Sequence, residues 1–249
     1  MQFRSERAGL VRYHDLPGDE TPIVFLHGLG CSGSHDYPTV ASDPCLSAHR
    51  RILIDLPGAG YSERTDQFGY TVPDHADVVA ELLGSIDLGA FILYGHSAGG
   101  AIALEVTRRL PGQVTALVLN EANLDPSSGE APSNVIASQT EAEFVESGYR
   151  EMVEALDDQW AAPLSNASPT AIWRLSKSLQ QGQNPSGREL LYGLDIPKAF
   201  IFGEESLPDD DAEELAKHDV RVVVAPGVGH SMAWEDAAVT ARAIAEALA

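Results

Sequence analysis

The stretch Phe-Ile-Leu-Tyr-Gly-His-Ser-Ala-Gly-Gly-Ala, residues 91–101, decides the fold of this chain. Its apolar first half is typical of a buried strand, and the small residues from Ala98 onward begin a helix. Gly95 and Gly99 bracket Ser97 in the pattern Gly-x-Ser-x-Gly. A serine at such a sharp turn between strand and helix needs neighbours without a Cβ atom, and its hydroxyl then points outward. The stretch therefore predicts an exposed nucleophile at Ser97.

Two apolar strands before this stretch also end in glycine-rich turns. Ile-Val-Phe-Leu-His-Gly-Leu-Gly occupies residues 23–30, and Arg-Ile-Leu-Ile-Asp-Leu-Pro-Gly-Ala-Gly-Tyr-Ser occupies residues 51–62. An edge hairpin or a single edge strand is expected within residues 1–22. The remaining pattern predicts strands at 90–94, 114–119, 199–203 and 220–224, and helices at 72–86, 98–110 and 235–248. Strands that alternate with helices predict a parallel sheet.

These motifs together resemble the α/β-hydrolase fold family over nearly the whole chain. The resemblance is carried by the His-Gly turn, the Asp-Leu-Pro-Gly-x-Gly-x-Ser turn, the Gly-x-Ser-x-Gly elbow and a late histidine. It implies a mostly parallel twisted sheet with helices on both faces. Between residues 124 and 194 no strand is evident and helices are expected. We therefore expect a core formed by 1–123 and 195–249, and a small helical lid, 124–194, over the carboxyl ends of the strands.

His230 is the candidate base for Ser97. A serine hydroxyl is a weak nucleophile at neutral pH and needs a base within hydrogen-bond reach. His230 lies in a loop after the last predicted strand, and this fold supplies its histidine late in the chain. A tetrahedral oxyanion needs two N–H donors aimed at one point. Ala98, directly after the nucleophile, is predicted to supply one donor, and Leu29, directly after the His-Gly turn, the other.

The acid that orients the histidine departs from the commonest family pattern. That pattern places Gly-x-x-Asp after the strand at 199–202, whereas this chain has Gly-Glu-Glu-Ser at 203–206. A serine cannot hold the charge that stabilises an imidazolium. Some members of the superfamily, including haloalkane dehalogenases and a group of fungal lactonases, place a Glu after the earlier strand. The resemblance therefore assigns the role to Glu121. The acids of the 204–209 loop stay as the alternative, although helix capping explains Asp209 to Asp211.

Composition restricts the partners of the chain. A formal net charge of −21, from 37 acidic and 16 basic residues, disfavours binding to nucleic acid and to anionic membranes. Two cysteines are too few for a disulfide framework, and the first residues lack the apolar segment of a secretory signal, so we expect a cytoplasmic protein. No phosphate-binding loop, cysteine pair or His-Glu-x-x-His motif is present. The sequence therefore indicates neither a nucleotide cofactor nor a metal.

The sequence predicts a cofactor-independent serine hydrolase that cleaves a small or medium carboxylic ester or lactone through an acyl-enzyme. Apolar walls are expected from the lid, in which Met152, Trp160, Trp173 and Tyr192 either face the small-molecule substrate or form the core of the lid. A dehalogenase or epoxide hydrolase is disfavoured because those enzymes use an Asp nucleophile. A carbon–carbon bond hydrolase and a perhydrolase remain open, since both can use a serine triad. A catalytically silent small-molecule receptor is the alternative of another class.

Overall fold

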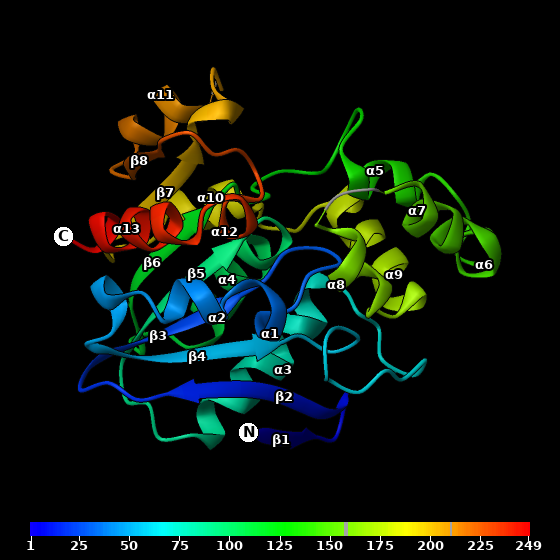
Figure 1. The fold of residues 1–249 in the computed structure, drawn as a ribbon, viewed down its shortest axis with the longest axis horizontal. Coiled ribbons are helices and arrows are strands. Elements are labelled where there is room, and N and C mark those ends of the chain that lie inside the picture. Colours follow the sequence, from blue (N-terminus) through cyan, green and yellow to red (C-terminus); the bar gives the residue numbers. More distant parts are fainter. Residues whose placement is uncertain (157–158, 210) are drawn as a thin grey trace.

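One eight-stranded sheet forms the centre of the protein. The computed structural model describes residues 1–156, 159–209 and 211–249. Within them the strand order is β1-β2-β4-β3-β5-β6-β7-β8, as Figure 1 shows. The strands are β1 (Gln2–Ser5), β2 (Gly9–Leu16), β3 (Glu20–Leu26), β4 (His49–Asp55), β5 (Phe91–His96), β6 (Val114–Asn120), β7 (Lys198–Gly203) and β8 (Arg221–Ala225). β1 and β2 form an antiparallel hairpin at one edge, and β3 to β8 run parallel. The predicted parallel sheet is confirmed, and of the two alternatives for residues 1–22 the structure has the edge hairpin.

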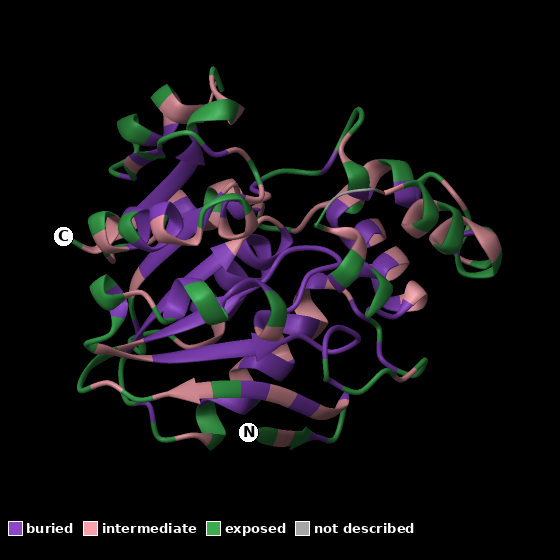
Figure 2. Ribbon diagram, viewed as in Figure 1, coloured by how far each residue is buried: buried purple, intermediate pink, exposed green. Residues whose placement is uncertain are grey.

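Helices cover both faces of this sheet because successive strand residues point to opposite sides. In β3, Val24 and Leu26 pack into one core with helices α3 (Val72–Ser85) and α4 (Ala98–Arg109). Ile23 and Phe25 pack into the other core with α2 (Pro38–Ala41) and α13 (Ala237–Leu248). Figure 2 shows the central strands as almost entirely buried. Two-sided burial explains why these strands are continuously apolar and do not alternate.

Short elements complete the core, and one predicted helix is divided. They are α1 (Gly33–Asp36), the 3-10 turns η1 (Pro44–Leu46) and η3 (Glu204–Ser206), α11 (Asp211–Lys217) and α12 (Met232–Glu235). The helix expected at 235–248 is wrong at its start. Asp236 has extended backbone angles (φ −153°, ψ 99°) and separates α12 from α13. Its side chain accepts from the N–H groups of Ala238 and Val239, so it caps α13.

The chain between β6 and β7 forms a helical insertion, of which α5 to α9 lie to the right in Figure 1. Its elements are α5 (Pro132–Ala137), α6 (Glu141–Glu143), the π-helical turn η2 (Phe144–Gly148), α7 (Tyr149–Ala155), α8 (Ala161–Ser165), α9 (Pro169–Gln181) and α10 (Gly187–Tyr192). No strand occurs in the part of the insertion that the structure describes. The division into a core and a lid at 124–194 stays a prediction. None of the helices in the described ranges is long and apolar enough to cross a membrane.

Polar contacts hold the insertion to the core beside α8. The Arg64 guanidinium donates to the backbone oxygen of Asn166 (2.8 Å) and to its side-chain oxygen (2.7 Å). The N–H of Ser168 donates to the Gly58 carbonyl (2.7 Å), and Ala59 forms an isolated bridge with Ala167. The turn after β4 therefore fixes the position of the link between α8 and α9.

His75 on α3 is a buried histidine without a charged partner. Its side chain is 2% exposed and packs against the rings of Phe68 and Tyr70. Its Nδ1 atom has no hydrogen-bond partner among the described residues. Burial, with a smaller contribution from His27, lowers the pKa of His75 to about 3. Below the ordinary histidine pKa of ~6.5 the unfolded chain binds a proton that the folded chain does not yet accept.

We therefore expect His75 to make the protein less stable as the pH falls from about 6.5 toward the folded pKa, by up to ~1.4 kcal/mol per pH unit. His75→Phe should remove this contribution. Urea unfolding of both proteins at several pH values between about 7.5 and 4.5 measures the effect. The stability advantage of the wild type over the variant should shrink as the pH falls. Parallel stability curves for the two proteins would contradict the assignment.

Candidate active site

Ser97 stands at a strained turn between β5 and α4. Its backbone angles are φ 52° and ψ −121°, in a region that residues with side chains rarely adopt. The neighbouring strand supports the turn, because the N–H of Ser97 donates to the Asn120 carbonyl (2.9 Å). A Cβ atom at Gly99 would lie 2.4 Å from the carbonyl oxygen of Leu26. The glycine pattern thus allows α4 to start directly against the end of β3.

Glu121 and His230 meet beside this turn. Glu121 directly follows β6, and its φ of 48° is again positive for a residue other than glycine. Its Oε1 accepts the N–H of Gly203 at the end of β7 (2.8 Å), and its Oε2 lies 3.7 Å from Nδ1 of His230. The Glu121 side chain is 10% exposed, whereas that of His230 is 55% exposed. A buried carboxylate therefore faces a histidine that is open to solvent.

The carboxylate of Glu121 is held in its charged form. Burial raises its pKa, but the neighbouring His230 and Ser206 side chains and the hydrogen bond from the Gly203 N–H outweigh burial, so the pKa of Glu121 lies below its ordinary value. Ser206 occupies the place where the commoner family pattern has its Asp. In this chain the side chain at that place lies near enough to the Glu121 carboxylate to lower its pKa, so the two positions are close in space.

The loop that carries His230 is fastened on several sides. The carboxylate of Glu235 accepts from the N–H groups of Gly229 and Ser231 (3.2 Å for Ser231), which flank the histidine. Glu204 accepts the N–H of Gly227 (2.9 Å). Sequence reasoning missed the role of Glu235. The sequence signal for this role is an acidic residue a few positions after a loop whose N–H groups need acceptors. Such a residue is easily taken for an ordinary helix residue.

His96 connects the nucleophile turn to this loop. Its Nε2 lies 2.9 Å from the carbonyl oxygen of His230. Burial, together with the proximity of His230, lowers the pKa of His96 to about 4. The imidazole is therefore neutral near pH 7, and since a carbonyl oxygen only accepts, Nε2 must carry the proton and donate it. His96, directly before Ser97, therefore holds the backbone of His230, which is expected to be the base.

The backbone beside Ser97 offers two N–H groups. Ala98 is fully buried at the first position of α4, and Leu29 is 9% exposed in the turn after β3. The backbone of Gly28 approaches closely, because a Cβ atom there would lie 3.3 Å from Cβ of Ser97. Within the described part of the chain, neither N–H donates to a backbone carbonyl. Both are therefore free to bind an oxyanion.

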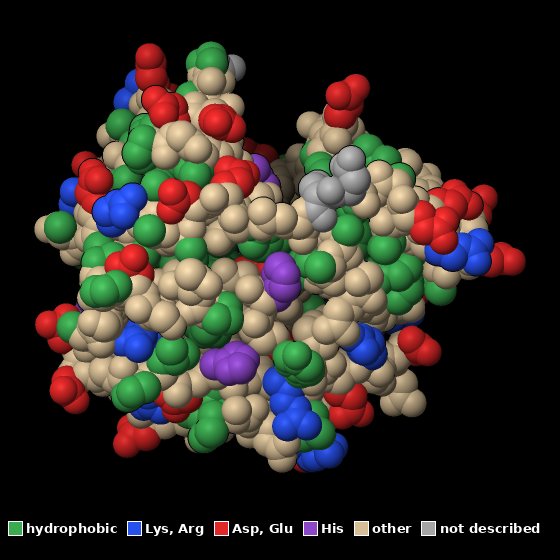
Figure 3. Space-filling view, viewed as in Figure 1, with side chains coloured by type: hydrophobic (Ala, Val, Ile, Leu, Met, Phe, Trp, Pro, Cys, Tyr) green, Lys and Arg blue, Asp and Glu red, His purple; other side chains and the backbone are tan. Residues whose placement is uncertain are grey.

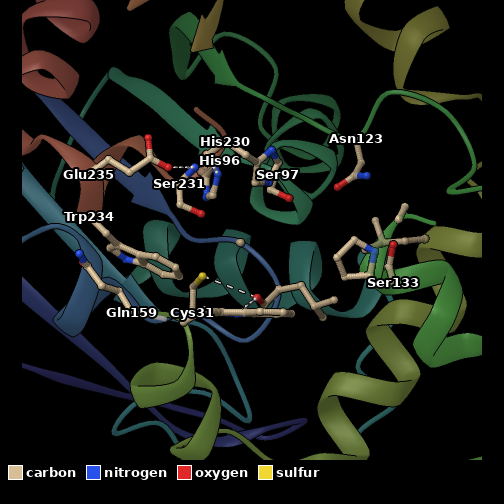
Figure 4. Close-up of a pocket in the computed structure, with 16 residues that line it drawn as sticks. Cys31, His96, Ser97, Asn123, Ser133, Gln159, His230, Ser231, Trp234 and Glu235 are labelled. Atoms are coloured by element: carbon tan, nitrogen blue, oxygen red, sulfur yellow. Dashed lines mark hydrogen bonds between the residues drawn. The ribbon is translucent and has the colours of Figure 1, made fainter. Parts of the chain in front are cut away.

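Leu29, Ser97, His96 and His230 line a pocket of about 450 Å³. Figure 4 shows Ser97 between His230 and His96 on one side and Asn123 and Ser133 on the other. The helical insertion contributes Ala131, Pro132, Ser133, Gln159, Trp160 and Leu179 to the walls. The surface in Figure 3 is hollowed between the insertion and the α11 end of the molecule.

Other residues singled out in the sequence lie at or outside this pocket. Trp160 lines it, whereas Met152, Trp173 and Tyr192 do not. Met152 and Trp173 pack against the core cluster, and the Tyr192 ring stacks on His218 with centroids 3.7 Å apart. Asp209 accepts the N–H of Asp211 (2.8 Å), which agrees with a capping role, and Asp210 lies outside the described residues.

The parallel sheet, the strained serine turn and the neighbouring histidine define an α/β hydrolase. The sequence profile of the alpha/beta hydrolase family matches residues 23–243, and the chain belongs to this family. A 2-succinyl-6-hydroxy-2,4-cyclohexadiene-1-carboxylate synthase from Enterobacter sp. (strain 638) is 24% identical over 244 residues, which cover 91% of each chain. Other curated relatives, at 33–36% identity, are matched over only 29–41% of their own length.

Solved structures share the fold over the full chain. A thermophilic esterase from Thermogutta terrifontis aligns with a TM-score of 0.81 at 22% identity, covering 100% of this chain and 97% of the esterase. The N-acyl homoserine lactonase AidH, complexed with N-butanoyl homoserine, aligns with a TM-score of 0.77 at 20% identity, covering 100% and 95%. At these identities the likeness concerns the fold.

The contact between Glu121 and His230 can be tested by removing the charge. Glu121→Gln keeps the size of the side chain but loses the carboxylate that stabilises an imidazolium, so we expect kcat to fall on the order of 10²–10⁴-fold. Glu204→Gln is the matched control, because Glu204 holds the same loop through the Gly227 N–H. Steady-state hydrolysis of a 4-nitrophenyl ester measures both. A larger loss in Glu204→Gln than in Glu121→Gln would place the acid in the 204–209 loop.

Proposed function

We propose that the protein is a serine hydrolase that cleaves an uncharged carboxylic ester or lactone through an acyl-enzyme. One observation carries the proposal. Ser97, His230 and Leu29 line a single pocket, Ala98 directly follows Ser97, and the largely buried carboxylate of Glu121 faces the histidine. A nucleophile, a base, an acid that orients the base and two oxyanion donors are the set that acyl transfer requires.

In this mechanism His230 takes the proton of the Ser97 hydroxyl as its oxygen attacks the carbonyl carbon of the substrate. The N–H groups of Leu29 and Ala98 hold the oxyanion of the tetrahedral intermediate, and Glu121 stabilises the imidazolium. His230 then protonates the leaving alcohol, which leaves an acyl group on Ser97. Water, activated by the same histidine, attacks the acyl group and releases the acid.

The charges around the pocket favour an uncharged substrate over a carboxylate. No Lys or Arg side chain lines the pocket among the described residues, whereas Glu235 lies at its wall. A carboxylate brought into such a pocket loses its hydration and finds no cation to pair with. The relative from Enterobacter is named for a product that carries a carboxylate. The absence of Lys and Arg among the described lining residues therefore favours an ester or lactone as substrate. It disfavours cleavage of a carbon–carbon bond in a carboxylated substrate.

Ser97→Ala should abolish both ester hydrolysis and covalent labelling by a fluorophosphonate, with the fold intact. The hydroxyl is the only group removed, and serine carries the covalent step. Turnover, labelling and thermal unfolding of the two proteins measure the effect. Labelling of wild type alone supports the enzyme over a silent receptor. If turnover in Ser97→Ala stays near the wild-type rate, Ser97 is not the nucleophile.

The charge preference is tested with two esters of equal chain length, 4-nitrophenyl pentanoate and the mono-4-nitrophenyl ester of glutaric acid. We expect kcat/KM to be at least about 10-fold lower for the anionic ester, which corresponds to ~1.4 kcal/mol or more. Added salt should narrow the gap, because it screens repulsion by the acidic surface. Equal kcat/KM values for the two esters would contradict the uncharged substrate while leaving the serine mechanism intact.

A further inference from the structure

The turn that presents Leu29 consists of residues 27–31, here called the oxyanion turn, and its first half is fixed by the core. The N–H of Leu56 donates to Nε2 of His27 (3.0 Å), so that nitrogen carries no proton. Nδ1 therefore bears the proton and donates to the Gly28 carbonyl (2.9 Å), which also accepts the N–H of Cys31 (3.2 Å). In a trans peptide the Gly28 oxygen and the Leu29 N–H point in opposite directions. These bonds thus set the direction of that N–H.

The second half of the oxyanion turn depends on the helical insertion. The carbonyl oxygen of Leu29 accepts the indole N–H of Trp160 (3.1 Å). Within the core, the Cys31 thiol lies 3.6 Å from this oxygen, and a thiol is a weak hydrogen-bond donor. Gly30 follows with φ 69°. Because glycine permits many backbone conformations, the peptide between Leu29 and Gly30 has little intrinsic resistance to rotation.

Packing agrees with this hydrogen bond. A Cβ atom at Gly30 would lie 2.6 Å from Cδ1 of Leu164 and 2.8 Å from Nε1 of Trp160. The oxyanion turn and the start of α8 are therefore in direct contact. The segment of α8 is itself held to the core by Arg64 and Asn166. Trp160 thus extends from a fixed part of the insertion to the turn.

We propose that Trp160 is a positioning residue that holds the oxyanion turn in its catalytic shape through the Leu29 carbonyl. The inference rests on the proposed function, because it takes the Leu29 N–H as an oxyanion donor. The insertion then has a second role besides lining the pocket. One indole N–H on the insertion fixes the peptide that follows the donor, so the insertion contributes to transition-state stabilisation without touching the reacting atoms.

Trp160→Phe tests the proposal, since it keeps an aromatic wall and removes the N–H. We expect kcat for 4-nitrophenyl butanoate to fall about 10-fold with KM changed less than about 2-fold. The loss should be smaller than the 10²–10³-fold that follows removal of a whole oxyanion donor, because the Leu29 N–H is still present. Inhibition by butylboronic acid, whose adduct on serine is tetrahedral, should weaken by a similar factor.

Trp173→Phe is the matched control. Its indole N–H also donates to a backbone carbonyl within the insertion, that of Gln139 (3.0 Å), but Trp173 does not line the pocket. We expect its kcat to stay within about 2-fold of wild type. Thermal unfolding of both variants measures any general loss of stability.

Different outcomes test the proposed function and the role of Trp160. Absence of ester hydrolysis and of fluorophosphonate labelling in the wild type would defeat the proposed function itself. With an active wild type, equal kcat in the two variants would overturn the role of Trp160. A rise in KM with unchanged kcat and unchanged boronate inhibition would also overturn it, since Trp160 would then only bind substrate. If Trp160→Phe does not fold, 3-benzothienylalanine at position 160 removes only the N–H from the same ring shape.

Discussion

The backbone turn at Ser97 is the constraint on which the rest of the structure depends. A positive φ at a serine costs free energy, on the order of 1–3 kcal/mol, and persists only where its surroundings enforce it. Here the Ser97 N–H is bound to the Asn120 carbonyl, and the Ser97 carbonyl accepts the N–H groups of Gly100 and Asn123. The end of β6 therefore holds the turn in place. The same chain segment, one residue after Asn120, supplies Glu121.

The backbone of Glu121 is bent for a related reason. Its φ of 48° lets its N–H bond the Ile201 carbonyl (3.1 Å) while its carboxylate bonds the Gly203 N–H (2.8 Å). Both contacts are to β7, so the residue lies across the ends of two parallel strands. Two strained residues at the ends of neighbouring strands thus share one network, in which the sheet positions Glu121 and Ser97, the proposed acid and nucleophile, together.

The sequence predicted the sheet, the serine turn and the helix at 72–86 because each depends on local patterns. In the structure Thr71 caps that helix and forms a capping box with Asp74. The contacts of Trp160, His96 and Glu235 were not predictable, since each joins segments that are adjacent only after folding, or uses an ordinary side chain on backbone groups. The sequence predicted that Glu121 replaces the acid that is absent at Ser206. It did not predict that the two residues lie close together. The two residues are close because each follows one of the neighbouring parallel strands β6 and β7.

The exposure of His230 at the pocket has a consequence for how charged molecules enter it. The His230 side chain is 55% exposed although the insertion is tied to the core at Arg64, Ser168 and Trp160, so this side of the pocket is open to solvent. Glu235 lies at the wall of the pocket, and acidic side chains lie on the surface on both sides of the hollow in Figure 3. In the proposed reaction the substrate is uncharged and the product is an acid that is ionised near pH 7. Acidic side chains around the opening would disfavour rebinding of that anion from solvent, so the proposed reaction would show little inhibition by its product.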